Sequence, residues 1–196
     1  MISGVEADDV IGTLSEQARE KKLSTVISTG DKDMTQLVCE HVSVVNTMNG
    51  ELLDEGGVEK KFGVPPNLIT DYLALIGDKS DNVPGVDKVG PKTAVKWLQE
   101  HKSLQGIINN ADQLSGKVGE NFRNSIDKLA LSHDLVTIKK DVNLELGIED
   151  LKVESPDIEK LTEIYEELEF RSWSEEVSQG NVNTKSTIKS NYKLIN

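Results

Sequence analysis

Three short acidic clusters are the part of this sequence whose residue types and spacing could do chemistry. They are Glu6-Ala7-Asp8-Asp9, Asp31-Lys32-Asp33 and Asp78-Lys79-Ser80-Asp81. Carboxylate oxygens are the ligands that hard divalent ions such as Mg²⁺ and Mn²⁺ prefer. Two such ions about 4 Å apart can activate water and stabilise the leaving oxygen in phosphodiester hydrolysis. The candidate metal ligands are therefore Glu6, Asp8, Asp9, Asp31, Asp33, Asp78 and Asp81.

Each cluster also has a simpler explanation when it is taken alone. Asp8 could be a helix cap, Asp31 a turn residue and Asp81 a solvated surface charge. An Asp-x-Asp pair after a strand also occurs in phosphotransferases, so the clusters alone do not fix the chemistry. A shared site requires that all seven carboxylates line one cleft, where their repulsion without metal should raise some of their pKa values.

The elements that must position these clusters can be predicted from hydrophobic periodicity. Apolar residues at helical spacing predict a helix over about 7–21, which the first cluster opens. A β-branched run predicts a buried strand at 24–29, and the second cluster falls in the loop just beyond it. The third cluster follows a helix predicted at 67–76. Ligand sites lie outside the carboxyl ends of strands in α/β sheets, so these loops can converge.

The rest of the chain divides by composition. A strand at 42–47 and a returning segment at 51–53, joined by the turn signal Asn49-Gly50, complete an α/β region at 1–62. A helix at 56–62 is expected to end this α/β region. A helical region follows at 63–176, with further helices expected at 91–100, about 118–133 and about 157–169. Residues 177–190 have the composition of a linker. Residues 191–196 turn apolar, as if another domain began there.

A glycine-containing hairpin between two of the predicted helices gives a second signal. The string NVPGVDKVGPKTA at 82–94 is much more specific than a lone Gly-x-Gly, which is usually an ordinary tight turn. Glycine allows close approach to the backbone, and free N–H groups at a helix start attract phosphate. This pattern predicts a grip on the DNA backbone that does not read base sequence. The residues expected to contact DNA are Ser80, Gly85, Val86, Val89, Gly90, Lys92, Thr93 and Lys96.

Composition restricts the possible partners and compartment. The net charge of -12 argues against a nucleic-acid partner, but cations would cover the clustered carboxylates, and five lysines gather between 79 and 102. Charge distribution matters more than the total. We expect no membrane segment, because no apolar run approaches the required length of about 20 residues. The single cysteine, Cys39, excludes an internal disulfide and fits a reducing cytoplasm.

Three strings together resemble a known family. GVEADDVIG at 4–12, STGDKDMTQL at 28–37 and GDKSDNVPGV at 77–86 are similar to the 5′–3′ exonuclease domain of bacterial DNA polymerase I. That domain belongs to the flap endonuclease family. The resemblance covers about residues 3–176, and its motifs are highly specific.

The resemblance implies a fold and an activity. The fold would be the C-terminal part of a PIN-like 5′-nuclease α/β sheet, followed by an all-helical subdomain with a helix–hairpin–helix at about 67–100. The activity would be Mg²⁺-dependent, two-metal hydrolysis of phosphodiester bonds in replication and repair. Among the seven metal ligands, Asp9, Asp31 and Asp33 would be catalytic, and Mn²⁺ could replace Mg²⁺. The hairpin would bind K⁺ through backbone carbonyls.

The same resemblance implies partners and an incomplete domain. The substrates would be duplex DNA with a 5′ flap, nick or overhang, and the 5′ end of an RNA primer. The protein would be a cytoplasmic monomer, covalently joined to polymerase domains. The family pattern starts earlier, with two further aspartates, so we expect a fragment truncated at both ends and inactive alone. The alternative is a duplex-DNA-binding module without nuclease activity. A phosphotransferase would leave the hairpin unexplained.

Overall fold

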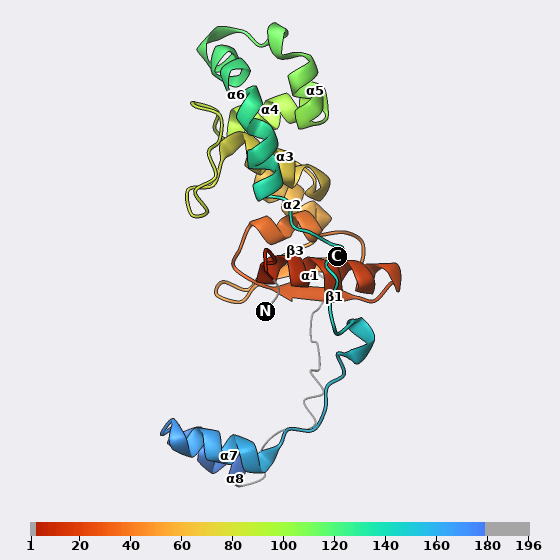
Figure 1. Cartoon of the computed structure of the whole chain (residues 1–196), viewed down its shortest axis with the longest axis vertical. Coiled ribbons are helices and arrows are strands. Elements are labelled where there is room, and N and C mark those ends of the chain that lie inside the picture. The colour runs from red at the N-terminus through yellow and green to blue at the C-terminus, as the bar shows by residue number, and fades with distance from the viewer. Residues whose placement is uncertain (1–2, 179–196) are drawn as a thin grey trace. The chain divides into compact units, whose positions relative to one another are not determined.

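The computed structural model describes residues 3–178 of the 196-residue chain. The chain divides into two compact units: the first extends to Ile148, and the second begins at Glu149 (Figure 1). Within residues 3–178, no helix has both the length and the apolar character needed to cross a membrane.

The first unit begins with a helix and a small mixed sheet. Helix α1 spans Ala7–Glu20, and strands β1, β2 and β3 span Thr25–Ser28, Val42–Asn46 and Glu51–Leu53. The strand order is β1-β2-β3, with β1 parallel and β3 antiparallel to β2. The side chains of Ile27, Val42, Val44 and Leu53 are buried on one face of the sheet. The predictions for 7–21, 24–29, 42–47 and 51–53 are confirmed to within two residues at each end.

The first unit is helical from α2 to α6, as predicted. The elements after β3 are α2 (Glu55–Phe62), η2 (Pro66–Leu68), α3 (Ile69–Ile76), α4 (Pro91–His101), α5 (Leu104–Asn109), η3 (Ala111–Gln113) and α6 (Gly116–Leu135). Helix α3 is the centre of this region, because Ile69, Leu73 and Leu75 on it are almost completely buried. Helices α4 and α6 meet through the rings of Trp97 and Phe122, whose centroids lie 5.4 Å apart. One continuous core runs from the sheet to α6.

Two short elements were not predicted and matter for the site. The 3₁₀ helix η1 (Asp33–Leu37) follows β1, so the second acidic cluster ends at a helix start rather than in a plain loop. The irregular segment 136–147, between α6 and η4 (Ile148–Asp150), returns from the helical region to α1. We call residues 136–148 the return segment.

The second unit consists of two helices within the described residues. Helices α7 (Ile158–Glu167) and α8 (Arg171–Ser178) pack through the rings of Tyr165, Phe170 and Trp173, with centroids 4.9 to 6.4 Å apart. Helix α7 matches the helix predicted at 157–169. The predicted linker at 177–190 starts inside α8; its remainder and the expected domain start at 191–196 lie outside the described residues.

Candidate metal centre and DNA-binding hairpin

The acidic clusters converge in one cleft of the first unit, with a volume of about 600 Å³. Six of the seven predicted carboxylates line it: Glu6, Asp8, Asp9, Asp31, Asp33 and Asp81. Asp134, near the end of α6, lines it as well and was not predicted. The seventh predicted ligand, Asp78, does not line the cleft and is only 4% exposed, so the prediction that all seven would line it is wrong for Asp78. Carboxylate oxygens of Asp33, Asp78 and Asp81 lie within 4.8 Å of one another. The start of α1, the loop after β1 and the loop after α3 therefore bring together residues separated by up to 75 positions in the sequence.

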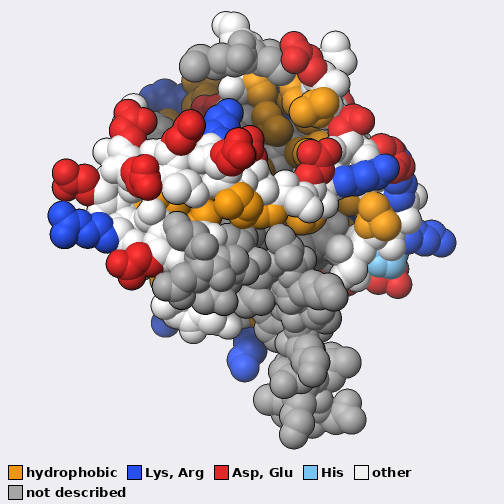
Figure 2. Space-filling model, turned by 90° about the horizontal axis from the view of Figure 1, so that it is seen from below, with side chains coloured by type: hydrophobic (Ala, Val, Ile, Leu, Met, Phe, Trp, Pro, Cys, Tyr) orange, Lys and Arg blue, Asp and Glu red, His pale blue; other side chains and the backbone are white. Residues whose placement is uncertain are grey.

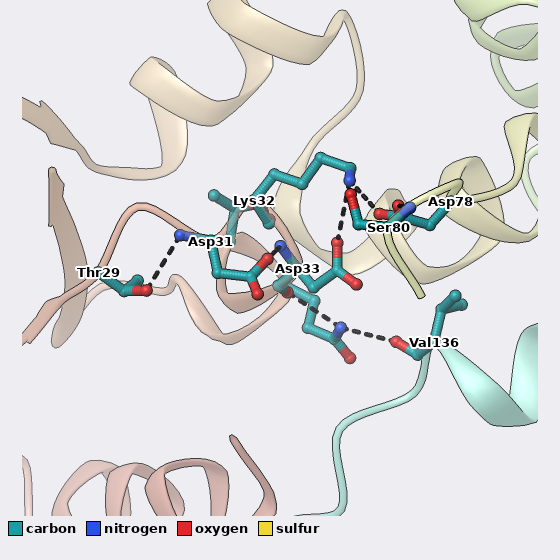
Figure 3. Close-up of polar contacts among 9 residues, drawn as sticks. Thr29, Asp31, Lys32, Asp33, Asp78, Ser80 and Val136 are labelled. Atoms are coloured by element: carbon teal, nitrogen blue, oxygen red, sulfur yellow. Dashed lines mark hydrogen bonds and ion pairs between the residues drawn. The ribbon is translucent and has the colours of Figure 1, made fainter. Parts of the chain in front are cut away.

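The loop after β1 is shaped by its own side chains. The N–H of Asp31 donates to the Thr29 hydroxyl at 3.0 Å, and the N–H of Asp33 donates to Asp31 Oδ1 at 2.9 Å (Figure 3). Asp31 is thus a turn residue, as its simpler explanation supposed. Asp31 is exposed and lines the cleft, so the turn and a ligand role are compatible.

The loop after α3 holds Asp78 and Asp81 by a close backbone contact. Asp78 and Val83 exchange both backbone hydrogen bonds, at 3.0 and 2.7 Å. Gly77 has a φ of +74°, and a Cβ built on it would lie 2.3 Å from the Gly85 nitrogen. Only glycine can occupy such a position without moving the backbone. This pairing of Gly77 with Gly85 fixes where the third acidic cluster begins.

The electrostatics of the cleft suit a divalent cation. Burial, followed by repulsion from Asp31, raises the pKa of Asp33 from 3.8 to about 6. Burial, followed by repulsion from Asp31 and Glu6, also raises the pKa of Asp8. The expected rise is confirmed for these two groups, although burial contributes more than repulsion. Asp33 Oδ1 is buried without a hydrogen-bond partner among the described residues. An all-oxygen donor set that includes a buried oxygen without a hydrogen bond fits Mg²⁺ or Mn²⁺.

Lysine 32, inside the second cluster, was not singled out from the sequence. Its ammonium group forms an ion pair with Asp78 Oδ2 and lies 3.8 Å from Asp33 Oδ1 (Figure 3). The bond to Lys32 holds the pKa of Asp78 below its usual value. A cationic side chain therefore lies among the carboxylates that would bind the metal.

Asp9 differs from the other carboxylates because both of its oxygens accept backbone N–H groups. Oδ2 accepts from Glu6 at the start of α1 at 3.1 Å, and Oδ1 accepts from Lys139 of the return segment at 2.9 Å. One and two turns further along α1, Thr13 and Gln17 accept the N–H groups of Val142 and Ile148. A polar stripe on α1 thus binds the return segment. Asp9, Thr13 and Gln17 are four positions apart, so they lie on one face of a helix. That spacing of polar residues was the sequence signal that could have predicted the contact.

Gln36 is a second residue that sequence reasoning missed. It is buried in η1, and its amide NH₂ donates to the carbonyls of Asp33 at 3.0 Å and Val136 at 2.9 Å. Its carbonyl oxygen accepts the N–H of Ile138 at 3.0 Å. Gln36 therefore ties the backbone that carries Asp33 to the return segment. No local pattern points to contacts about a hundred residues away in the chain.

The hairpin presents its polar side to solvent and buries its aliphatic side. Val83, Val86 and Val89 are buried, so only the backbones of Val86 and Val89 could face DNA. The side chains of Lys88, Lys92 and Lys96 are exposed. Helix α6 supports the hairpin from behind, where the Ser132 hydroxyl donates to the Pro84 carbonyl at 2.8 Å and the Asn121 amide donates to the Asp87 carbonyl at 3.0 Å.

The two hairpin glycines have different roles. A Cβ on Gly85 would lie 2.3 Å from the Ile76 carbonyl carbon, so this glycine serves contact within the chain. A Cβ on Gly90 would meet no atom within 4 Å. Gly90 also has a φ of -106°, which any residue can adopt, and it caps α4 ahead of Pro91. Only Gly90 leaves open backbone for an outside group, whereas both glycines were expected to do so.

On the face drawn in Figure 2, Asp and Glu side chains are scattered among lysines and arginines rather than gathered in one patch. Their spread agrees with the net charge of -12.

Two family models match adjacent parts of the chain. Residues 1–63 match the model described as 5′–3′ exonuclease, N-terminal resolvase-like domain. Residues 64–159 match the model described as 5′–3′ exonuclease, C-terminal SAM fold. The α/β region and the helical region of the first unit thus correspond to a PIN-like, resolvase-like domain and a SAM-like helical domain. The predicted fold class, a 5′-nuclease α/β sheet followed by an all-helical subdomain, is confirmed.

Two similar proteins, a DNA polymerase I and a 5′–3′ exonuclease, are longer than this chain. DNA polymerase I of Pseudomonas aeruginosa is 46% identical over 188 residues, which are 90% of this chain and 20% of that protein. The 5′–3′ exonuclease of Aquifex aeolicus is 44% identical over 178 residues, which are 91% of this chain and 61% of that protein. The chain therefore spans about a fifth of the first and three fifths of the second.

Solved structures show the same fold. The bacteriophage T5 D15 protein, co-crystallised with metal ions, aligns with a TM-score of 0.62 and 24% identity over 69% of this chain and 52% of that one. The T5 D15 flap endonuclease in a pseudo-enzyme–product complex with DNA and metal ions aligns with a TM-score of 0.63 and 24% identity, over 69% and 50% of the two chains.

Proposed function

This chain belongs to the 5′–3′ exonuclease family, and on that premise we propose that it carries the metal-binding carboxylates and the DNA-gripping hairpin of a 5′-nuclease. The reaction would be hydrolysis of phosphodiester bonds in DNA during replication and repair. The single observation that carries this proposal is the convergence of three distant acidic clusters in one cleft. The simpler explanations of each cluster do not predict that convergence.

The carboxylates would divide between two ions of Mg²⁺ or Mn²⁺. Asp33, Asp78 and Asp81 would hold one ion, because their oxygens lie within 4.8 Å of one another. Glu6, Asp8 and Asp31, which line the same cleft, would hold the other. When bound, such ions lower the pKa of a coordinated water and stabilise charge on the leaving oxygen.

Asp9 would act by positioning rather than by binding an ion directly. Its two oxygens already accept the N–H groups of Glu6 and Lys139. A carboxylate that is used in this way holds the first cluster in place at the start of α1. Asp31 and Asp33 would remain the carboxylates nearest the chemistry, since they lie in the cleft on one short loop.

The substrate would be duplex DNA bearing a 5′ flap, nick or overhang, or the 5′ end of an RNA primer. The open backbone at Gly90, the free start of α4 and the exposed Lys92 and Lys96 are suited to a phosphate backbone. Contacts to phosphate fix the register of a duplex and carry no base specificity. K⁺ bound by hairpin carbonyls stays a prediction, as does covalent attachment to polymerase domains.

A DNA-binding module without nuclease activity is the second candidate, and the findings do not favour it. Binding alone gives no reason for a buried Asp33 oxygen that accepts no hydrogen bond and lies among other carboxylates. Both matching family models are also those of a nuclease.

The reaction can be tested by exchange into a longer relative. The part of the Aquifex aeolicus exonuclease that matches this chain is replaced by this chain, and cleavage of a labelled 5′-flap duplex is measured with Mg²⁺. We expect cleavage that EDTA abolishes and that Asp33→Asn reduces by at least about 100-fold. Asp112→Asn, an equal charge change on the exposed side of η3, is the control. A folded chimera whose cleavage does not depend on Asp33 would contradict the proposal.

A further inference from the structure

The ion pair of Lys32 places a positive charge where the proposed metal centre needs a cation. The ammonium group contacts Asp78 Oδ2 and lies 3.8 Å from Asp33 Oδ1 (Figure 3). These are two of the three residues whose oxygens could close around one ion. The site therefore has two possible occupants, a divalent ion and the chain's own lysine.

Asp78 cannot serve both occupants with the contacts that it makes here. Its Oδ1 accepts the Ser80 N–H at 2.7 Å, which fixes the carboxylate plane, and its Oδ2 is taken by Lys32. The side chain of Asp78 is 4% exposed, so it has no room to turn toward solvent. A metal that binds Asp78 Oδ2 must therefore displace the ammonium group.

Lys32 is able to leave. Its side chain is 39% exposed, in contrast to that of Asp78, and lysine carries its charge as a compact group on a flexible stem. The other charged groups that act on it, Asp31 and Asp33, belong to the same cluster and would also turn to the metal. When a divalent ion replaces the ammonium group, two positive charges take the place of one, so the buried carboxylates of Asp33 and Asp78 stay compensated.

We propose that Lys32 is a built-in competitor of the divalent ion: it neutralises Asp33 and Asp78 in the metal-free protein and is displaced from Asp78 when the ion binds. This inference rests on the metal centre proposed above. It makes Lys32 a residue that sets metal affinity, rather than a ligand or a merely structural partner. Removal of Lys32 should strengthen ion binding and weaken the metal-free fold.

The test is a Mn²⁺ titration of the full chain, followed by electron paramagnetic resonance of the free ion. Lys32→Met should tighten binding at one site by roughly two- to fivefold, the upper part of the range of a partly exposed charge pair. Lys79→Met is the matched control, because it removes the same charge from an exposed position beside Asp78 and should change affinity less than about twofold. Equal or weaker binding by Lys32→Met, relative to the wild type, overturns the proposal.

A second measurement uses only the wild-type chain, so it can be made even if Lys32→Met does not fold. The lysines of the wild-type chain are briefly acetylated with and without Mg²⁺, and the modification of Lys32 is quantified by mass spectrometry. Displacement predicts that Lys32 reacts several times faster with Mg²⁺, while Lys79 keeps its rate. A Lys32 rate that does not rise, in a chain shown to bind the ion, overturns the exchange. If the wild-type chain binds no Mn²⁺ at all, it is the metal centre itself that fails.

Discussion

Replacement of Asp33 by asparagine should change how the stability of the metal-free chain depends on pH. Asp33 has a side chain that is only 12% exposed and a pKa raised from 3.8 to about 6. Burial is the main cause; Asp31, Asp78 and Asp81 add repulsion, and Lys32 opposes them. A neutral amide of the same size removes the titrating group while it keeps most of the packing.

The sign and magnitude follow from proton linkage. Because the pKa is higher in the folded state, the folded chain binds the proton more tightly than the unfolded chain does. The resulting stability is fully present below the unfolded pKa and is lost as the pH rises through about 6. At 1.36 kcal/mol for each unit, the full effect is about 3 kcal/mol, of which roughly 2 kcal/mol falls between about pH 4.5 and pH 7.5.

The assay is urea unfolding in EDTA at these two pH values, for the wild type and for Asp33→Asn. From the lower to the higher pH, the wild type should lose about 2 kcal/mol more unfolding free energy than the variant does. Asp112→Asn, with the same change of charge outside the cleft, is the control for net-charge effects. A difference between wild type and Asp33→Asn that is the same at both pH values would refute the assignment of a buried, repelled carboxylate at position 33.

Three further predictions concern positioning and DNA contact. Asp9→Asn should cost about 1–3 kcal/mol of unfolding free energy even in EDTA, because an amide cannot accept both backbone N–H groups; a loss seen only with metal present would mean that Asp9 is a ligand and not an anchor. Gly85→Ala should lower the melting temperature, because its Cβ would force two backbones apart, whereas Gly90→Val should leave the melting temperature nearly unchanged and weaken binding to nicked duplex DNA. A larger loss of melting temperature for Gly90→Val in calorimetry, or weaker DNA binding only for Gly85→Ala in fluorescence anisotropy, would contradict the roles of the two glycines. Lys92→Ala should weaken binding without regard to base sequence and reduce the salt dependence of affinity by about one phosphate contact; an unchanged salt slope would remove Lys92 from the interface.

Much of this architecture could be predicted because it is encoded locally. The apolar periodicity of 7–21 and the β-branched run at 24–29 fix one helix and one strand, and their ends fix where two acidic clusters lie. Convergence followed from the rule that loops at the carboxyl ends of strands share one edge of the sheet. Helix α5, with Ser103 bonded to the Gly106 N–H as its cap, was not predicted, because six residues give too little periodicity.

The contacts that hold the site rigid could not be predicted in the same way. Gln36 bonds to Val136 and Ile138, and Asp9 bonds to Lys139, across a hundred or more positions of sequence. The return segment has no regular structure before its last residue, so its position depends on acceptors that another element supplies. The two hairpin glycines look alike in sequence, and only three-dimensional neighbours separate them. Local patterns therefore predicted where the carboxylates lie but not what anchors them.

The most direct test of the central claim is to ask whether an ion in the carboxylate cleft lies beside DNA that is held by the hairpin. Fe²⁺, which takes similar oxygen ligands, is added to the chain bound to a 5′-flap duplex, and ascorbate with peroxide generates hydroxyl radicals at the ion. We predict strand cuts focused within a few nucleotides of the flap junction, which Asp33→Asn combined with Asp78→Asn abolishes while DNA binding persists. Cuts that are absent, or spread evenly along a bound duplex, would show that the cleft and the hairpin do not form one metal-dependent site.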